Sequence, residues 1–235
     1  MVAPHLVAGR ATGGALPCVF ARGNHDLRGV CAERYAELTP TDCGKSYCEF
    51  RLGPVWGVVL DTGEDKPDDH PEYGGTVCCG EFRAEEELWL RQVCRRGPPA
   101  GSAWRLVVCH NPFAFRLRPP FDIEQRRWKR WLRLLRALGP SAMLCGHLHE
   151  CFAEDPGGPH DSLGAPCPVV CASAIDRKAR RFVCGAVAIG RDGRIDAAFV
   201  DQDGRRANAS AGSIHGRIPA FKGTRPRAAG THEKK

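Results

Sequence analysis

The chain has 235 residues, of which 43% are hydrophobic and 26% are charged. A folded body of this length buries about 70% of its unfolded surface, and no apolar run approaches the roughly 18 residues of a membrane span, so a disulfide-stapled miniprotein and a transmembrane protein are both excluded. The net charge of +7 is concentrated in residues 203–235, where eight Lys or Arg accompany two Asp or Glu, so residues 1–202 carry only +1.

Thirteen cysteines occur along the chain, and none forms a C-x-x-C pair. Several of them end apolar runs, as Cys109 and Cys145 do, where a thiol behaves as a small hydrophobic group. We therefore expect reduced, mostly buried cysteines rather than disulfides or cysteine-bound zinc. The first residues have neither a basic start nor an apolar core, so we expect no secretory signal and a cytoplasmic protein.

The first half of the chain is predicted to hold a short strand, a helix and a β-hairpin. Residues 1–17 are rich in Gly, Ala and Pro and form an irregular N-terminal segment. The predicted strand at 18–21 ends at the sequence Arg22-Gly23-Asn24-His25-Asp26. The next predicted elements are a helix at 30–38, strands at 46–52 and 55–61 around the turn Gly53-Pro54, and a polar loop at 62–80.

The second half of the chain is predicted to alternate helices and strands. A surface helix at 84–95 is followed by a buried strand at 104–109, a helix at 122–138 and a short strand at 142–145. Three more strands are expected at 168–174, 181–189 and 194–201. The polar and basic composition from Asp203 onward predicts a disordered tail over 203–235, which leaves residues 18–202 as the folded domain.

The helix at 122–138 has two different faces. Its apolar face consists of Trp128, Trp131, Leu132, Leu135 and Leu138, and Lys or Arg residues occupy most of the rest. Such a helix can bind a membrane surface or nucleic acid. A helix that covers a sheet and exposes its basic side to solvent explains the pattern equally well, and we favour this interpretation.

Three predicted strands each end next to histidine. The sequence Asn24-His25-Asp26 follows the first strand, His110-Asn111-Pro112 follows the strand at 104–109, and Gly146-His147-Leu148-His149 follows the strand at 142–145. Strand ends are where α/β folds collect active-site groups. Neutral imidazoles together with an amide oxygen suit zinc, iron, manganese or nickel better than calcium, so the pattern favours a transition-metal site.

The series G-N-H-D, H-N-P and G-H-L-H resembles the later motifs of the calcineurin-like metallophosphoesterases, a superfamily that includes purple acid phosphatases. The motifs occur in the same order, and residues 44–63 are similar to the superfamily's central hairpin. The resemblance covers about residues 18–200 and implies a four-layer αββα sandwich of two mixed β-sheets. It also implies two transition-metal ions (Mn, Fe or Zn) bridged by a hydroxide that attacks phosphorus. By position, the first ion is ligated by Asn24, His110 and His147, and the second by His149.

The resemblance implies catalytic roles for residues near the first motif. His25 is expected to hold the phosphoryl group and to protonate the leaving oxygen, with Asp26 orienting it. Arg28 is a candidate to bind an oxygen of the phosphoester substrate.

The superfamily's first motifs, D-x-H and G-D-x-x-D, are missing, because no Asp or Glu precedes Asp26. The literal D-x-H at Asp68-Asp69-His70 lies in the polar loop, out of order, and we interpret it as part of a solvated or substrate-side loop. Without a bridging carboxylate two cations repel each other across mostly neutral ligands, so tight dinuclear binding is not expected. Either the chain is an N-terminally truncated piece of a longer phosphoesterase, or it keeps the fold without the catalysis. We favour truncation, because the first residues are rich in Gly, Ala and Pro and have no pattern, and we expect weak or no activity of this chain alone.

The main hypothesis is a metal-dependent hydrolase of phosphate mono- or diesters with a dinuclear centre. The alternative is a non-catalytic binding module whose histidines hold at most one ion. A third hypothesis is nucleic-acid binding by the basic tail and the helix at 122–138, which we do not favour because residues 1–202 are nearly neutral. The sequence makes no prediction of the oligomeric state.

Overall fold

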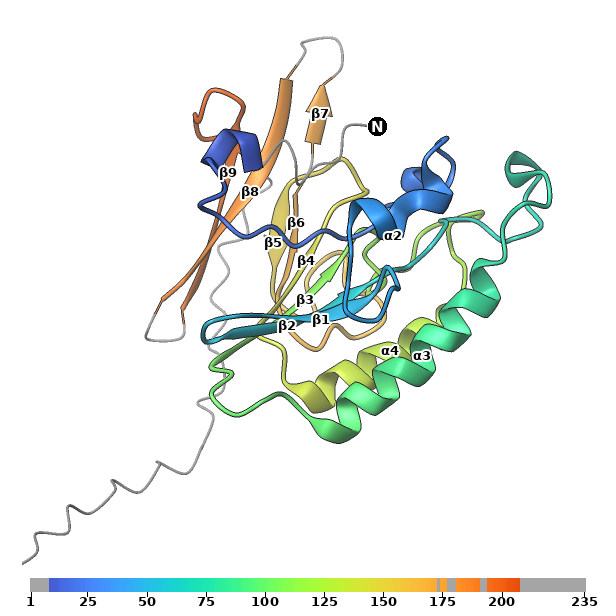
Figure 1. Ribbon diagram of the computed structural model, residues 1–235, viewed down its shortest axis with the longest axis horizontal. Coiled ribbons are helices and arrows are strands. Elements are labelled where there is room, and N and C mark those ends of the chain that lie inside the picture. Colours follow the sequence, from blue (N-terminus) through green and yellow to red (C-terminus); the bar gives the residue numbers. More distant parts are fainter. Residues whose placement is uncertain (1–8, 173, 177–180, 191–193, 208–235) are drawn as a thin grey trace, which may run out of the picture.

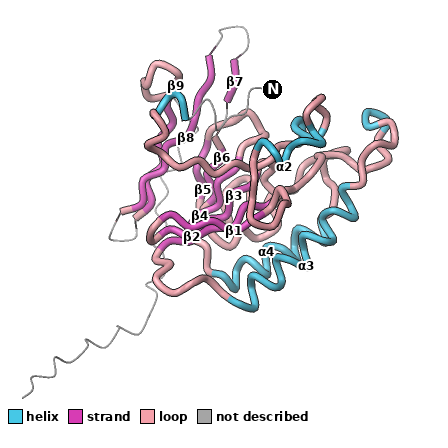
Figure 2. The backbone as a smooth tube through the Cα atoms, viewed as in Figure 1, coloured by secondary structure: helices cyan, strands magenta, loops and turns pink. Residues whose placement is uncertain are grey.

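The computed structural model of the chain describes residues 9–172, 174–176, 181–190 and 194–207. In these residues two β-sheets and two long helices make up the body of the protein (Figure 1). Helices α3 (Cys79–Arg96) and α4 (Gln125–Leu138) cover one face of the larger sheet, and the smaller sheet packs against its other face (Figure 2). The arrangement confirms the predicted α/β class with two packed sheets. The resemblance implied two mixed sheets between two helical layers, whereas the smaller sheet is antiparallel over its described residues and both long helices lie on the larger sheet.

The larger sheet has the strand order β1-β2-β3-β4-β6-β5, with parallel strands in the middle and antiparallel strands at both edges. The parallel strands are β2 (Val55–Leu60), β3 (Trp104–Cys109), β4 (Ala142–Cys145) and β6 (Val169–Cys171), and the edge strands are β1 (Cys48–Leu52) and β5 (Phe152–Glu154). The register pairs Leu60 with Cys109 and Val108 with Leu144, so β2, β3 and β4 end at the same edge of the sheet. Groups that follow these strands are therefore brought together.

The smaller sheet is antiparallel over its described residues and consists of β7 (Ala174–Asp176), β8 (Arg181–Ile189) and β9 (Ile195–Asp201). Phe199 of β9 is buried in a cluster with Ala153 of β5 and Val170 of β6, which joins the two sheets. The opposite face of β8 is open to solvent, since the side chain of Phe182 is 52% exposed.

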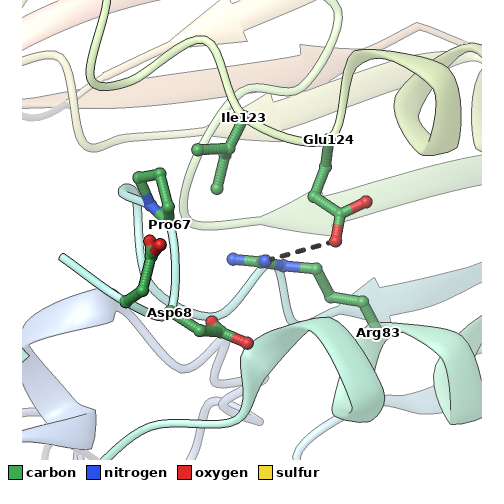
Figure 3. A pocket seen from close by; sticks show the side chains of 6 residues that line it. Pro67, Asp68, Arg83, Ile123 and Glu124 are labelled. Atoms are coloured by element: carbon green, nitrogen blue, oxygen red, sulfur yellow. Dashed lines mark ion pairs between the residues drawn. The ribbon is translucent and has the colours of Figure 1, made fainter. Parts of the chain in front are cut away.

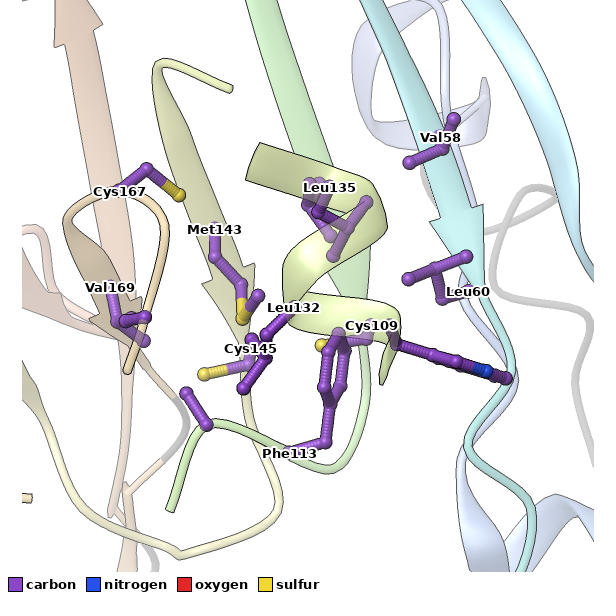
Figure 4. Packing of buried hydrophobic residues seen from close by; sticks show 14 of the residues in the cluster. Val58, Leu60, Cys109, Phe113, Leu132, Leu135, Met143, Cys145, Cys167 and Val169 are labelled. Carbon is purple, nitrogen blue, oxygen red and sulfur yellow. The ribbon is translucent and has the colours of Figure 1, made fainter. Parts of the chain in front are cut away.

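The main hydrophobic core lies between the larger sheet and the two helices. Figure 4 shows Leu60 of β2, Met143 of β4 and Leu132 of α4 in this layer. All five residues of the predicted apolar face of α4 are buried. Each such side chain contributes about 1.5–3 kcal/mol relative to an exposed one, so this face fixes α4 on the sheet. On the basic side of α4, Arg130 forms an ion pair with Glu87 of α3, which neutralises part of the positive charge.

Some predicted elements are wrong or displaced. The segment at 18–21 forms no strand, because no strand in the described residues pairs with it. The predicted helix at 30–38 is reduced to a 3-10 turn at Ala32–Arg34 and the single turn α2 (Tyr35–Leu38). Helix α3 begins at Cys79 rather than at residue 84, and the predicted strand at 168–174 is divided between β6 and β7. Most of the predicted tail, residues 208–235, lies outside the described residues.

Two expectations from composition concern cysteines and membranes. All thirteen cysteines lie in the described residues and are free, and the buried ones are Cys79, Cys109, Cys145, Cys151, Cys167 and Cys171. Within the described ranges no helix has the length and apolar character that crossing a membrane requires.

Candidate functional site

The histidines predicted to act together meet at the edge where β2, β3 and β4 end. His110 follows β3 and His147 follows β4, and their ring centroids are 5.3 Å apart in an edge-to-face arrangement. The 3-10 helix Asn24–Leu27 lies beside them, since an ideal Cβ atom on Gly23 would come within 3.1 Å of the His110 ring. The absence of a side chain at Gly23 therefore allows this close approach.

The electrostatic environment keeps two of the imidazoles neutral. Burial, followed by the nearby imidazoles of His147, His25 and His149, lowers the pKa of His110 to about 4, against the opposing effect of Asp26. Burial also lowers the pKa of His147. Neutral imidazole is the form that ligates a metal ion, so both rings are in the binding form near pH 7.

The turn after β4 has an unusual backbone. His147 has a φ of 68° and His149 a φ of 57°, both in the left-handed region that residues other than glycine rarely adopt. A hydrogen bond from Gly146 N to His110 O, 3.0 Å long, ties this turn to the end of β3. Strained positions of this kind cost of order 1–3 kcal/mol and cluster at functional sites.

A metal ion is implied by the motifs, and the residues present fit one in their chemistry. The side chain of Asn24 is only 1% exposed, and its Oδ1 atom is buried without a hydrogen-bond partner. A buried amide oxygen without a partner costs free energy that a cation at this atom would recover. Across the described part of the chain, however, no three His, Cys, Asp or Glu side chains are gathered tightly enough to hold an ion by themselves.

The other predicted catalytic residues lie in the same region. His25 is exposed, and the Oδ2 atom of Asp26 accepts a hydrogen bond of 2.9 Å from Gly23 N, which closes the turn around Asn24. Arg28 is not free for a substrate as it stands, because its guanidinium pairs with Glu64 and Glu72. Its predicted contact with a phosphate oxygen would require these pairs to open.

Sequence reasoning missed the carboxylates of the turn Asp61–Asp65, which follows β2. The sequence predicted a strand that ends at Asp61 and a polar loop at 62–80, but Asp61, Glu64 and Asp65 are at most 9% exposed. Asp65 faces the site, with its Oδ2 atom 3.6 Å from Nε2 of His147. The sequence feature that could have indicated this site is the position of the turn directly after the buried strand β2. That strand pairs with β3, which His110 follows.

The literal D-x-H motif has structural roles. Asp68 Oδ2 accepts a hydrogen bond of 2.8 Å from Gly80 N in the first turn of α3, and His70 Nδ1 accepts one of 3.3 Å from Glu72 N. Asp68 lines a hollow of about 430 Å³. Figure 3 shows it there with Arg83 and Glu124, which form an ion pair. Asp68 and His70 thus accept hydrogen bonds from backbone N–H groups at the starts of two helices.

The comparison with protein families agrees with the motifs. Residues 4–151, more than half of the chain, match the family of calcineurin-like phosphoesterases. Over 160 residues the chain is 26% identical to the serine/threonine-protein phosphatase CPPED1 of Danio rerio, a match that covers 66% of this chain and 47% of that protein. The chain thus spans about half the length of this curated relative. Among solved structures, the purple acid phosphatase PPD1 from yellow lupin (Lupinus luteus) seeds is similar over 80% of this chain and 36% of that one, with 13% identity and a TM-score of 0.43. On the family match, the chain belongs to the calcineurin-like phosphoesterases.

Proposed function

We propose that this chain is a metal-dependent hydrolase of phosphate mono- or diesters. The observation that carries the proposal is the contact between the neutral imidazoles of His110 and His147 at one sheet edge, with Gly23 against the His110 ring. The next residue, Asn24, has an amide oxygen that is buried without a partner. Family membership supports phosphoester hydrolysis as the reaction class. The name of the Danio rerio relative adds a phosphoserine or phosphothreonine peptide as a substrate to test.

In this proposal Asn24, His110 and His147 hold one ion and His149 holds a second. Bound transition-metal ions would neutralise charge on the phosphoryl oxygens and bring the pKa of a water molecule toward 7. The exposed imidazole of His25 holds a phosphoryl oxygen and donates a proton to the leaving oxygen. Because Asp26 accepts a hydrogen bond from Gly23, it fixes the turn that places Asn24 and His25.

The test is hydrolysis of p-nitrophenyl phosphate and bis(p-nitrophenyl) phosphate with added Mn²⁺ or Zn²⁺. We expect His25→Ala and His147→Ala to remove most of the turnover, which we expect to be weak in the chain as it stands. His70→Ala is the matched control, because His70 caps a short helix and is not one of the residues proposed to bind metal or substrate. Turnover that survives both site variants, or that His70→Ala alone removes, would contradict the site assignment.

A non-catalytic binding module is the second candidate. The observation in its favour is that the described residues show no group of three His, Cys, Asp or Glu side chains placed to hold an ion. Metal content measured after dialysis separates the two candidates. Turnover with one or two bound ions per chain supports the hydrolase, and at most one ion together with no turnover supports the module.

A further inference from the structure

The carboxylates of the turn Asp61–Asp65 differ in how their charge is satisfied. Asp61 pairs with Arg22, and Glu64 forms two hydrogen bonds with Arg28, of 2.6 and 2.9 Å. Asp65 has no arginine partner among the described residues. Its nearest cation is the ammonium of Lys66, 3.4 Å away, which lies closer to Glu72, at 2.8 Å. Asp65 is therefore the buried carboxylate of this turn whose charge is least compensated.

The free oxygen of Asp65 points at a histidine of the candidate site. Its Oδ2 atom is 3.6 Å from Nε2 of His147, and the two side chains are only 10% and 14% exposed. This separation is too long for a good hydrogen bond. Two ligand atoms bound at about 2.1 Å to one tetrahedral ion lie about 3.4 Å apart. The observed gap is therefore close to the spacing that a shared metal ion requires.

The other oxygen of Asp65 is already held in place. Tyr73 is buried, and its hydroxyl donates a hydrogen bond of 3.0 Å to Asp65 Oδ1 while accepting one of 3.1 Å from Lys66 N. A buried donor that fixes one carboxylate oxygen and leaves the other directed at the site is the usual surrounding of a metal-binding carboxylate.

The backbone of the turn is also fixed from the helix side. Arg83 of α3 is 2% exposed and donates hydrogen bonds to Thr62 O and Glu64 O. Asn111, which follows His110, donates through Nδ2 to Gly63 O at 3.4 Å. Asp65 is thus attached to rigid elements on two sides, as a preorganised ligand must be.

We propose that Asp65 is the carboxylate ligand of the cation site and shares one divalent transition-metal ion with His147. The inference rests on the proposed function, because it takes the site to bind a metal. Asp65 supplies the negative charge that the ligand set of amide and imidazole groups lacks, and this charge offsets the cost of placing a cation in a partly buried site.

The experiment measures the affinity of the full chain for Zn²⁺ and Mn²⁺ by calorimetry. Asp65→Asn keeps the size of the side chain and an oxygen for Tyr73 but removes the charge. The matched control is Asp69→Asn, an exposed carboxylate of the same loop. We expect Asp65→Asn to weaken Zn²⁺ binding about 100-fold, Tyr73→Phe to weaken it about tenfold, and Asp69→Asn to leave it unchanged.

Each outcome decides the question. Equal Zn²⁺ affinity of Asp65→Asn and Asp69→Asn would overturn the role of Asp65 and leave the proposed function standing. An unaltered chain that binds neither ion would overturn both. If circular dichroism shows that Asp65→Asn does not fold, Tyr73→Phe takes its place, and an unchanged affinity in that variant overturns the role.

Discussion

The ion pair between Arg28 and Glu64 gives a prediction that separates a structural role from a substrate-binding one. The side chain of Glu64 is fully buried, and that of Arg28 is 27% exposed. Removing one partner of a buried pair costs about 3–5 kcal/mol, because the other charge remains buried and unpaired. Solvent reaches part of Arg28, so we take the lower end and expect Arg28→Met to lower the free energy of unfolding by about 3 kcal/mol.

The assay is urea and thermal unfolding followed by circular dichroism. For a domain of this size a loss of 1 kcal/mol lowers Tm by about 2–4 °C, so we expect Arg28→Met to lower Tm by about 6–12 °C. The double variant Arg28→Met/Glu64→Gln leaves no unpaired charge at this position, and we expect it to be more stable than Arg28→Met alone by about 1–2 kcal/mol. Glu64→Gln alone is milder, because Arg28 keeps Glu72 and solvent.

A different result would refute this reasoning. If Arg28→Met unfolds within about 0.5 kcal/mol of the unaltered chain and raises KM for a phosphoester, Arg28 is a substrate ligand and its pairing with Glu64 contributes little.

Three further predictions test the site, a buried acid and the core. Gly23 has φ −94° and ψ 163°, which alanine also adopts, so Gly23→Ala should keep the fold. The added Cβ atom should displace the His110 ring and weaken Zn²⁺ binding. The control is Gly9→Ala, whose Cβ atom meets no other atom within 4 Å. Burial raises the pKa of Glu86 well above its usual value, so the folded chain retains this proton and its stability falls as the pH rises from about 4.5. Glu86→Gln should remove that decline, and urea unfolding at several pH values measures it. Leu135→Ala, at a fully buried position of α4, should cost about 2–5 kcal/mol in the same assay, whereas the exposed neighbour Arg133→Ala should stay within about 0.5 kcal/mol.

The parts of the fold that sequence predicted well have strong hydrophobic periodicity. The apolar face of α4 and the buried strand β3 both depend on side chains repeated at helical or strand spacing, and both occur where they were predicted. The strand predicted at 18–21 is absent, although the segment has the composition of a strand, because strand formation also depends on a partner elsewhere in the chain. The strand β5 was missed because its three residues are too few to show a period.

The candidate site likewise has residues that the sequence predicted and one that it did not. Motif order was enough to place His110 and His147 at one sheet edge, because parallel strands end together. The same reasoning could not find Asp65, because a run of Asp, Glu and Gly after a strand has the composition of a solvated loop. Its burial depends on Arg83 and Tyr73, which contact the turn from other segments and have no pattern in the local sequence.

Charge decides between the hydrolase and the binding module. The ligands proposed at Asn24, His110 and His147 are neutral, and Asp65 would add a single negative charge to this set. One carboxylate offsets half the charge of one divalent ion. Two divalent ions about 4 Å apart repel each other by about 4 kcal/mol for each pair of unit charges, at an effective dielectric constant of 20. A first ion beside His147 is therefore favoured much more than a second ion beside the exposed His149. A phosphoester substrate carries the missing negative charge, so the second ion and the substrate should bind together. The hydrolase and the module then differ in whether substrate brings the second metal ion into the site.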